Sequence, residues 1–341
     1  MKTNKLGIIG CGKQAEKHIG SLRKVDGADI VVADIDPRLA QALSRKCGVS
    51  FTDSVDELFD MEGLGAILVC TPTPTHADLI RRGLESGRRV FCEKPVCTTR
   101  QEAVDLRRLE ERSGGRVVVG YLYRHVPAFQ AVRRLLDGPG ADGTDPPLGR
   151  PLTAAFRIGG RGSHQVWKHI KAKGGGAINE MLVHMLDLAG WFFGPMDRQS
   201  IEVPACRLLL PVREIGGRPV EVDAEDYVVV RMRSKGGVEI LYQADLITPA
   251  FSQYVEIQGE NGSLMASIQA DMPSFIYLKE ARAGFHAGRN ELASSGPPAL
   301  DRQMEAFVNG VRHDAVDPTH TLADSIELME TLERIRTLQG E

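Results

Sequence analysis

The chain has 341 residues, which is long enough for two domains that each bury a core of their own. Its 42 Lys and Arg residues against 45 Asp and Glu residues give a formal net charge of −3, so we expect a small-molecule partner and no nucleic acid or anionic membrane surface. No apolar run is long enough to span a bilayer or to act as a secretion signal, and the six cysteines lack the paired spacing of a metal site, so we expect a cytoplasmic protein with reduced thiols and no metal.

The first predicted elements are a strand, a glycine turn and a helix. An apolar run over residues 6–9 leads directly into Gly10, Cys11, Gly12, Lys13, Gln14 and Ala15. Gly10 permits the tight turn, Gly12 has no side chain to block a pyrophosphate, and Ala15 lets the helix pack closely on the strand. We interpret these six residues as cofactor-binding candidates in a dinucleotide motif; the alternative is an ordinary crossover whose glycines serve packing.

The second predicted strand, residues 30–34, ends in an acidic residue. Asp34 stands at the distance from the glycine motif at which a carboxylate binds the adenosine ribose hydroxyls of a dinucleotide. No Arg or Lys follows before Arg38, so a 2′-phosphate would meet a carboxylate without a nearby cation. We expect the cofactor to be NAD, with NADP less favoured.

Short β-rich runs and helical periodicity alternate as far as residue 121. Further strands are expected at residues 66–70, 89–92 and 117–121, and helices at residues 36–47 and 75–86. Near-continuous apolar strands that alternate with helices are typical of a parallel sheet covered on both faces. Residues 1–121 are therefore predicted to form a doubly wound α/β domain.

A loop with candidate site residues follows the strand predicted at residues 66–70, and ligands of open parallel sheets bind at such strand ends. Thr71, Pro72 and His76 lie in this loop, whose prolines make it stiff enough to pack along a nicotinamide or its ribose. His76 can instead begin a helix with Thr75 as its N-cap. Both interpretations of His76 stay open.

The strand predicted at residues 89–92 ends in Glu93, Lys94 and Pro95. A lysine brought to the rim of the sheet and followed by a proline is a candidate catalytic group. Taken alone, Lys94 is more simply explained as a solvated surface residue. Glu93 and Lys94 are also candidates for binding the cofactor.

Beyond a helix predicted at 127–137 and a loop at 138–147, the pattern changes to that of a second domain. Alternating strands are expected at residues 153–158, 227–233, 238–244, 254–258 and 263–267, with a hairpin turn at 234–237. Helices are expected at residues 177–191, 300–311 and 319–338, and a second loop at 283–298. Residues 122–341 are therefore predicted to form an α+β domain with a mostly antiparallel sheet.

Three glycines, residues 174–176, precede the helix predicted at 177–191 and would let a substrate approach the backbone. Glu180 and His184 are four positions apart on one helix face, and Asp187 continues this face. A carboxylate beside an imidazole sets its tautomer and raises its basicity. We predict that Glu180 and His184 are catalytic; a buried core histidine is the alternative.

Three motifs in this order resemble the Gfo/Idh/MocA oxidoreductase family. They are the glycine motif at residues 10–15, Glu93-Lys94-Pro95, and the three glycines followed by Glu180 and His184. The similarity extends over essentially the whole chain and includes residues 119–124, 149–151 and 257–264. It implies a Rossmann domain, a C-terminal α/β domain with a large open sheet that often forms the oligomer interface, and NAD(P)-dependent oxidation or reduction of a sugar-like hydroxyl. Lys94 matches the family lysine that contacts the reacting oxygen, and His184 matches the proposed acid/base. Glu180 stands where the family commonly has Asp.

The resemblance also implies the substrate contacts and the function. Besides Lys94, Glu180 and His184, the segments that tend to line the family's pocket contain Tyr121, Arg124, His164, Trp167 and Lys168, for which a structural or solvated role is an equal alternative. The implied substrate is a sugar, amino sugar or aminoglycoside, cyclitol or nucleotide sugar, and the implied assembly is a homodimer or homotetramer formed through the C-terminal sheet. A non-catalytic cofactor- or sugar-sensing regulator and a double-bond or imine reductase are the alternatives.

Overall fold

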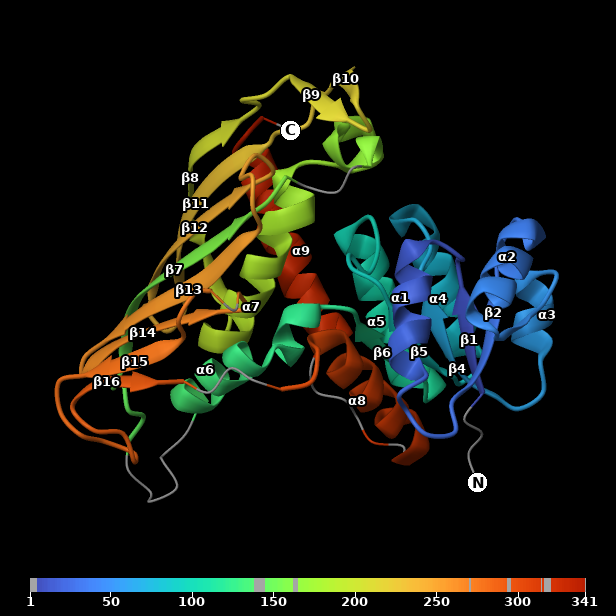
Figure 1. The fold of residues 1–341 in the computed structure, drawn as a ribbon, viewed down its shortest axis with the longest axis horizontal. Helices are drawn as coiled ribbons and strands as arrows, with labels where there is room; N and C mark the ends of the chain where they lie inside the picture. The colour runs from blue at the N-terminus through green and yellow to red at the C-terminus, as the bar shows by residue number, and fades with distance from the viewer. Residues whose placement is uncertain are drawn as a thin grey trace. The chain divides into compact units, whose positions relative to one another are not determined.

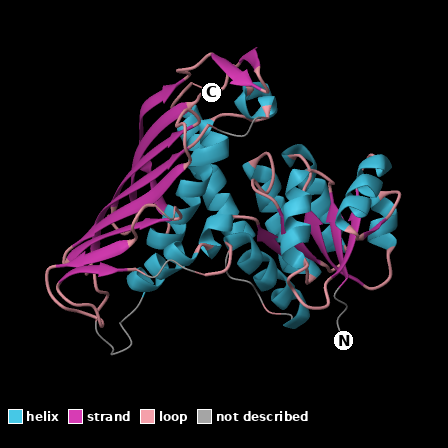
Figure 2. Ribbon diagram, viewed as in Figure 1, coloured by secondary structure: helices cyan, strands magenta, loops and turns pink. Residues whose placement is uncertain are grey.

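The computed structural model describes residues 5–137, 145–161, 165–269, 271–292, 296–313, 315 and 320–340. The chain forms two compact units: Met1–His125 with Pro297–Met329, and Val126–Gly296 with Glu330–Glu341 (Figures 1 and 2). It therefore leaves the first unit, forms the second, returns to the first and ends in the second. The sequence predicted a single boundary after residue 121, with all the C-terminal helices in the second domain, so residues 297–329 differ from that prediction.

The first unit is built around a six-stranded parallel sheet in the order β3-β2-β1-β4-β5-β6. The strands are β1 Lys5–Ile9, β2 Asp29–Ala33, β3 Ser50–Phe51, β4 Leu64–Val69, β5 Arg89–Cys92 and β6 Arg116–Val119. This order is that of dinucleotide-binding doubly wound folds. It confirms the predicted fold class, and it places the ends of β1, β2, β4 and β5 at one edge of the sheet.

Helices cover both faces of this sheet. They are α1 Lys13–Leu22, α2 Pro37–Cys47, α3 Val55–Asp60, α4 His76–Glu85, α5 Arg100–Ser113 and α8 Ala299–His313. Ile19 of α1, Leu43 of α2 and Phe307 of α8 belong to one buried cluster with Leu6 and Ile8 of β1. The second cluster joins α3 to the other face of the sheet. The last part of the chain is thus needed to complete the core of the first unit.

The second unit contains an eight-stranded sheet in the order β16-β15-β14-β13-β7-β12-β11-β8, with a separate hairpin β9-β10. Its strands are β7 Pro151–Gly159, β8 Met196–Arg207, β9 Val212–Ile215, β10 Arg218–Glu221, β11 Tyr227–Ser234, β12 Glu239–Asp245, β13 Ser252–Gly259, β14 Gly262–Ser267, β15 Phe275–Leu278 and β16 Gly288–Glu291. All neighbours in the large sheet are antiparallel except β7 and β12, which are parallel. The predicted hairpin is confirmed as β11-β12.

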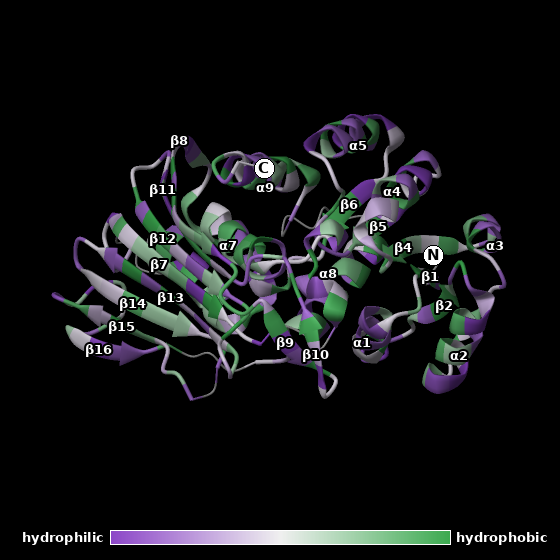
Figure 3. Cartoon of the chain, turned by 90° about the horizontal axis from the view of Figure 1, so that it is seen from above, coloured by the Kyte–Doolittle hydropathy of each residue, from purple (hydrophilic) through white to green (hydrophobic). Residues whose placement is uncertain are grey.

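One face of this sheet is covered by α6 Pro127–Asp137 and α7 Val183–Phe193 (Figure 1). Phe156 of β7 stacks on Tyr242 of β12 at 5.3 Å between ring centroids, and Phe192 of α7 lies 6.2 Å from Phe156. Buried and exposed residues alternate along β11, and Figure 3 shows the same alternation as green and purple along the strands. The period-2 pattern of these strands thus corresponds to a sheet with one buried face.

Three predicted segments differ from the structure or lie outside it. The helix predicted at 177–191 begins as a π-helical turn, Ile178–Leu182, before α7. The loop predicted at 283–298 contains β16, and residues 293–295 in it lie outside the described residues. Most of the loop predicted at 138–147 also lies outside them. The last helix, α9, spans Leu322–Thr337, and among the helices of the described ranges none is long and apolar enough to cross a membrane.

Candidate active site

The glycine turn after β1 has the backbone geometry that its sequence predicts. Gly10 has a φ of +94°, and a Cβ atom there would lie 2.7 Å from the carbonyl oxygen of Cys70, so only glycine fits. Gly12 is the N-cap of α1, no side chain caps this helix end, and no atom lies within 4 Å of the position a Cβ would take at Gly12. The turn therefore leaves the N-terminus of α1 open to an anion such as a pyrophosphate.

Asp34 ties the end of β2 to the glycine turn. Its Oδ2 accepts a hydrogen bond of 2.7 Å from the backbone N–H of Cys11, and its Oδ1 accepts one of 3.0 Å from Asp36. Burial and then the charge of Asp34 raise the pKa of the Cys11 thiol to about 12, so this thiol stays neutral. The carboxylate is oriented by two backbone donors and keeps lone pairs for ribose hydroxyls.

The cation nearest to Asp34 in sequence already has a partner. Arg38 donates from Nε and Nη2 to the two oxygens of Asp36, each at 2.9 Å. Between these two acidic residues, the side chain of Ile35 is 97% exposed. An exposed apolar side chain beside Asp34 offers a surface on which a flat aromatic ring can rest.

Glu93, at the end of β5, receives two hydrogen bonds from α1. Gln14 Nε2 donates to Glu93 Oε1 at 3.0 Å, and His18 Nε2 lies 2.6 Å from the same oxygen. Burial by itself raises the pKa of this carboxyl, but the His18 bond and charge, the Gln14 bond and the Lys94 charge outweigh it and lower the pKa. His18 is not among the predicted site residues, although its spacing of one helical turn from Gln14 places both on one face of α1.

His76 joins the two loops that carry Thr71 and Lys94. Its Nδ1 lies 2.8 Å from the carbonyl oxygen of Pro95 and its Nε2 lies 2.8 Å from that of Thr71, and the ring is buried. Thr75 is the N-cap residue of α4, but its hydroxyl donates to Pro72 and makes no cap bond. These contacts favour an organising role for His76 within the loops. A direct contact of His76 with the cofactor stays a prediction.

In the second unit, three predicted site residues lie together. Lys168 Nζ forms an ion pair with Glu180 Oε2, and the same ammonium lies 5.3 Å from the centre of the Trp167 ring. Glu180 is in the π-helical turn and His184 is half-buried in the first turn of α7. π-helical turns inside α-helices occur frequently at functional sites. The pairing of Glu180 with Lys168 was not predicted.

Glu225 fixes the start of this π-helical turn. Its Oε1 accepts a hydrogen bond of 3.0 Å from the backbone N–H of Ile178, and its carbonyl oxygen accepts one of 2.8 Å from Ala177. Gly176 has a φ of +109°, and a Cβ atom there would lie 2.3 Å from Glu225 Oε1. The glycine is therefore required by this close approach of Glu225, a contact that no local sequence pattern indicates.

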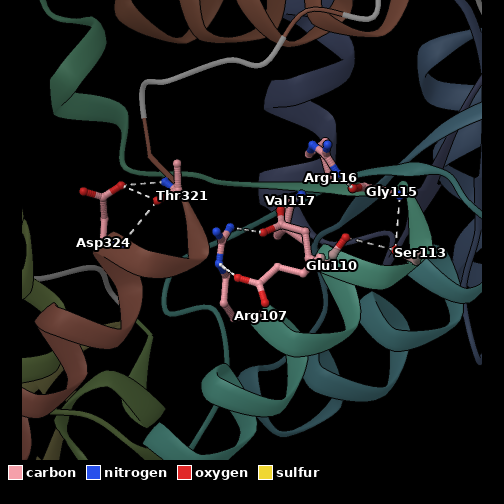
Figure 4. A network of polar contacts seen from close by, with 9 residues as sticks. Arg107, Glu110, Ser113, Gly115, Arg116, Val117, Thr321 and Asp324 are labelled. Atoms are coloured by element: carbon pink, nitrogen blue, oxygen red, sulfur yellow. Dashed lines mark hydrogen bonds and ion pairs between the residues drawn. The ribbon is translucent and has the colours of Figure 1, made fainter.

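Tyr121 and Arg124 lie in the first unit and are buried. The Tyr121 ring lies 4.2 Å from the His320 ring, and Arg124 Nη2 lies 3.7 Å from Asp324 Oδ1. Asp324 also accepts hydrogen bonds from the N–H and hydroxyl of Thr321 at the start of α9 (Figure 4). These contacts give Tyr121 and Arg124 a role in fixing α9, and substrate binding by them stays a prediction.

His164 lies outside the described residues. Asp187 is buried on α7. No group of three or more His, Cys, Asp or Glu side chains that could hold a metal occurs in the part of the chain that the structure describes.

Both halves of the chain match known oxidoreductase family domains. Residues 4–121 match "Oxidoreductase family, NAD-binding Rossmann fold" and residues 147–337 match "Oxidoreductase family, C-terminal alpha/beta domain". The inositol 2-dehydrogenase 3 of Saccharopolyspora erythraea is 33% identical over 325 residues, which cover 92% of this chain and 86% of that protein.

Solved structures with the same fold include two proteins in complex with NADH or NAD. Levoglucosan dehydrogenase in complex with NADH and levoglucosan has a TM-score of 0.82 at 18% identity and covers 98% of this chain and 96% of that chain. GenD2 from gentamicin A biosynthesis in complex with NAD has a TM-score of 0.78 at 22% identity and covers 100% of this chain and 96% of that chain. At these identities the likeness concerns the fold.

Proposed function

The chain belongs to the Gfo/Idh/MocA oxidoreductase family, whose N-terminal domain is an NAD-binding Rossmann fold, and from this premise we propose that it is a dehydrogenase that uses NAD to oxidise a secondary hydroxyl of a sugar-like substrate. The observation that carries the proposal is the convergence of Gly10, Gly12, Asp34 and Glu93 at one edge of the parallel sheet. Gly10 allows the close approach of the Cys70 carbonyl in this turn, and Gly12 leaves the N-terminus of α1 without a side-chain cap.

The residues of this edge fit NAD. The N-terminus of α1 would bind the pyrophosphate, Asp34 the adenosine ribose, and the loop at Thr71 and Pro72 the nicotinamide half. Arg38 is engaged by Asp36, which favours NAD over NADP. When bound, NAD supplies the hydride acceptor at the nicotinamide ring.

The chain's own residues would move the proton and stabilise charge. We propose that His184 accepts the proton of the substrate hydroxyl, and that the Lys94 ammonium stabilises the negative charge that develops on the oxygen. Proton transfer of this kind contributes roughly 10² to 10⁴ in rate. Glu180, paired with Lys168, would set the tautomer of His184 or contact the substrate.

The substrate we propose is a polyhydroxylated ring: a sugar, amino sugar or aminoglycoside, cyclitol or nucleotide sugar. The support comes from relatives and neighbours that are named as dehydrogenases of inositol and levoglucosan. A second copy of the chain would pack on the sheet face opposite α6 and α7, where Leu241 and Tyr277 are exposed. Sedimentation of the wild type and of a Leu241→Lys variant would test this assembly.

The function is tested by NADH formation with NAD or NADP and a panel of inositols, hexoses, amino sugars and nucleotide sugars. We expect turnover with NAD, and a loss of orders of magnitude in kcat for His184→Ala and Lys94→Ala with NADH binding almost unchanged. NADH binding without turnover on any member of the panel would favour a cofactor-sensing regulator instead. Near-normal turnover of either variant would remove that residue from the mechanism.

A further inference from the structure

His18 has a position that no known motif of this chain accounts for. It lies on α1, fully buried, with Nε2 at 2.6 Å from Glu93 Oε1. We infer that His18 and Gln14 are positioning residues that fix the Glu93 carboxylate as the charged partner of Lys94. The inference rests on the proposed role of Lys94 in the oxidation reaction.

Two donors from one helix meet one carboxylate oxygen. Gln14 and His18 are one turn apart on α1, and both bonds go to Oε1 of Glu93. The backbone N–H of Glu93 also donates to the carbonyl oxygen of Val69 at 3.0 Å. With its backbone and one oxygen fixed, the carboxylate has little freedom to rotate, and Oε2 is the oxygen that remains for a further partner.

The surroundings of Glu93 favour its ionised form. The side chain is 16% exposed, and burial alone favours a neutral carboxyl, but the bonds and charges of His18, Gln14 and Lys94 lower the pKa. The other titratable neighbours are the Cys70 and Cys92 thiols, whose pKa burial and then the charge of Glu93 raise well above the usual value. These thiols stay neutral. They therefore do not attract the Lys94 ammonium away from Glu93, and they do not repel the Glu93 carboxylate.

Packing alone does not explain a histidine at position 18. The ring contacts Phe91 edge-on at 5.2 Å between centroids, a contact that an apolar side chain could replace. Its Nδ1 is buried and finds no hydrogen-bond partner in the described part of the chain, which is unfavourable. The buried His76, by contrast, has both ring nitrogens at 2.8 Å from carbonyl oxygens. The bond to Glu93 is therefore the contact that accounts for His18.

The consequence concerns Lys94. A carboxylate held next in sequence attracts the ammonium and limits where it can move, and an ammonium held in place can stabilise a developing alkoxide. If His18 no longer donates, the carboxylate can rotate away and Lys94 loses a fixed partner. The effect on catalysis then acts through Glu93, since His18 itself is fully buried.

The test compares Glu93→Gln, His18→Leu and His18→Gln with the wild type. Glu93→Gln keeps the shape and removes the charge, His18→Leu fills the space without a donor, and His18→Gln keeps an amide donor. The rate at which acetic anhydride modifies Lys94 at one fixed pH is measured by mass spectrometry of the full-length protein. The exposed Lys17 serves as the internal reference.

We expect acetic anhydride to modify Lys94 several-fold faster, relative to Lys17, in Glu93→Gln than in the wild type, because the ammonium loses the carboxylate that holds it in place. His18→Leu should show part of this increase, and His18→Gln should restore the wild-type rate. With an active substrate, kcat of His18→Leu should fall roughly 10- to 100-fold, as for other residues that orient a reacting group, while the dissociation constant of NADH stays almost unchanged.

Equal rates of Lys94 modification in Glu93→Gln and the wild type would overturn the inference. This readout needs no turnover, so it stays decisive even if no sugar-like substrate is oxidised and the proposed function fails. If His18→Leu does not fold, as judged by its thermal unfolding, the comparison of His18→Gln with Glu93→Gln still decides: an equal increase in the rate of Lys94 modification in both variants would also overturn the role of the His18 donor.

Discussion

Two acidic residues at the end of β2 have different partners. Asp34 accepts hydrogen bonds from the backbone of Cys11 and Asp36, whereas the Asp36 side chain binds the guanidinium of Arg38. The hydrogen bonds and charge of Arg38 hold the pKa of Asp36 below its usual range. We therefore expect cofactor choice to depend on Asp36 as well as on Asp34, because the ion pair with Asp36 keeps Arg38 from a 2′-phosphate.

The first prediction concerns Asp36→Asn. Asparagine keeps an oxygen that can cap α2, where Asp36 accepts from the Arg38 N–H at 3.0 Å, but it loses the charge that engages the guanidinium. We expect the dissociation constant for NADP to fall several-fold and that for NAD to stay nearly constant, measured by fluorescence titration. Adding Arg38→Ala should abolish the gain. An unchanged ratio of the two constants in Asp36→Asn would contradict this role of Asp36.

The second prediction concerns the Glu180 and Lys168 pair. If Glu180 serves the imidazole of His184, Glu180→Gln should lower kcat and move the acid limb of its pH profile to lower pH, because a carboxylate favours the imidazolium. Lys168→Met should move the same limb to higher pH, since it leaves the Glu180 charge uncompensated. Glu180→Asp should lose activity only moderately.

A substrate contact of Glu180 would give a different kinetic result. Glu180→Gln would then chiefly raise KM, provided that the contact is equally strong in the ground and transition states. Limbs that stay in place in both Glu180→Gln and Lys168→Met would show that neither residue acts on His184.

At the scale of elements, the π-helical turn Ile178–Leu182 depends on Glu225. The carboxylate caps Ile178 and lies where a side chain at Gly176 would stand. Gly174 offers a matched control, because its φ of +76° is also positive but no atom lies within 4 Å of the corresponding Cβ position. The two glycines therefore separate backbone strain from displacement of Glu225.

The third prediction is that Gly176→Ala is more harmful than Gly174→Ala. Gly174→Ala should lower the free energy of unfolding by about 1 to 2 kcal/mol, the cost of a side chain in the left-handed region, and should leave kcat nearly unchanged. Gly176→Ala adds the displacement of Glu225, so both stability and kcat should fall further. Denaturant unfolding and steady-state kinetics measure the two effects, and equal values for both variants would show that the Glu225 contact has no influence on the turn.

At the scale of the whole molecule, the chain returns to the first unit and supplies α8 to its core. Met304, Phe307, Val308 and Val311 of α8 are buried in the cluster that also contains β1, α1 and α2. Burial of one such side chain contributes about 1.5 to 3 kcal/mol. The four together are comparable to the total stability of a domain, about 5 to 15 kcal/mol.

The fourth prediction follows from this comparison. A fragment of residues 1–125 should not unfold cooperatively and should not bind NADH, because its core lacks α8. The same fragment joined by a Gly/Ser linker to residues 297–329 should do both, as measured by thermal circular dichroism and NADH fluorescence. If the shorter fragment melts cooperatively and binds NADH as tightly as the longer one, α8 is dispensable for the first unit.

The sequence by itself determined the features that depend on neighbouring residues. The glycine turn, the acidic end of β2 and the alternation of strands and helices are local, and period-2 patterns correctly predicted the sheet of the second unit. Strand ends of a parallel sheet lie at one edge, so the joint position of Asp34, Thr71 and Glu93 also followed from the pattern.

Only the tertiary structure decided which distant side chains meet. His18 and Glu93 are separated by 75 positions in the sequence. Lys168 and its partner Glu180 are separated by 12 positions and lie in different helical segments. Periodicity shows which face of an element is buried, but it carries no information on which buried face lies opposite. The π-helical turn, the contact of Gly176 with Glu225 and the packing of α8 in the first unit arise from such contacts, so local pattern could not determine them.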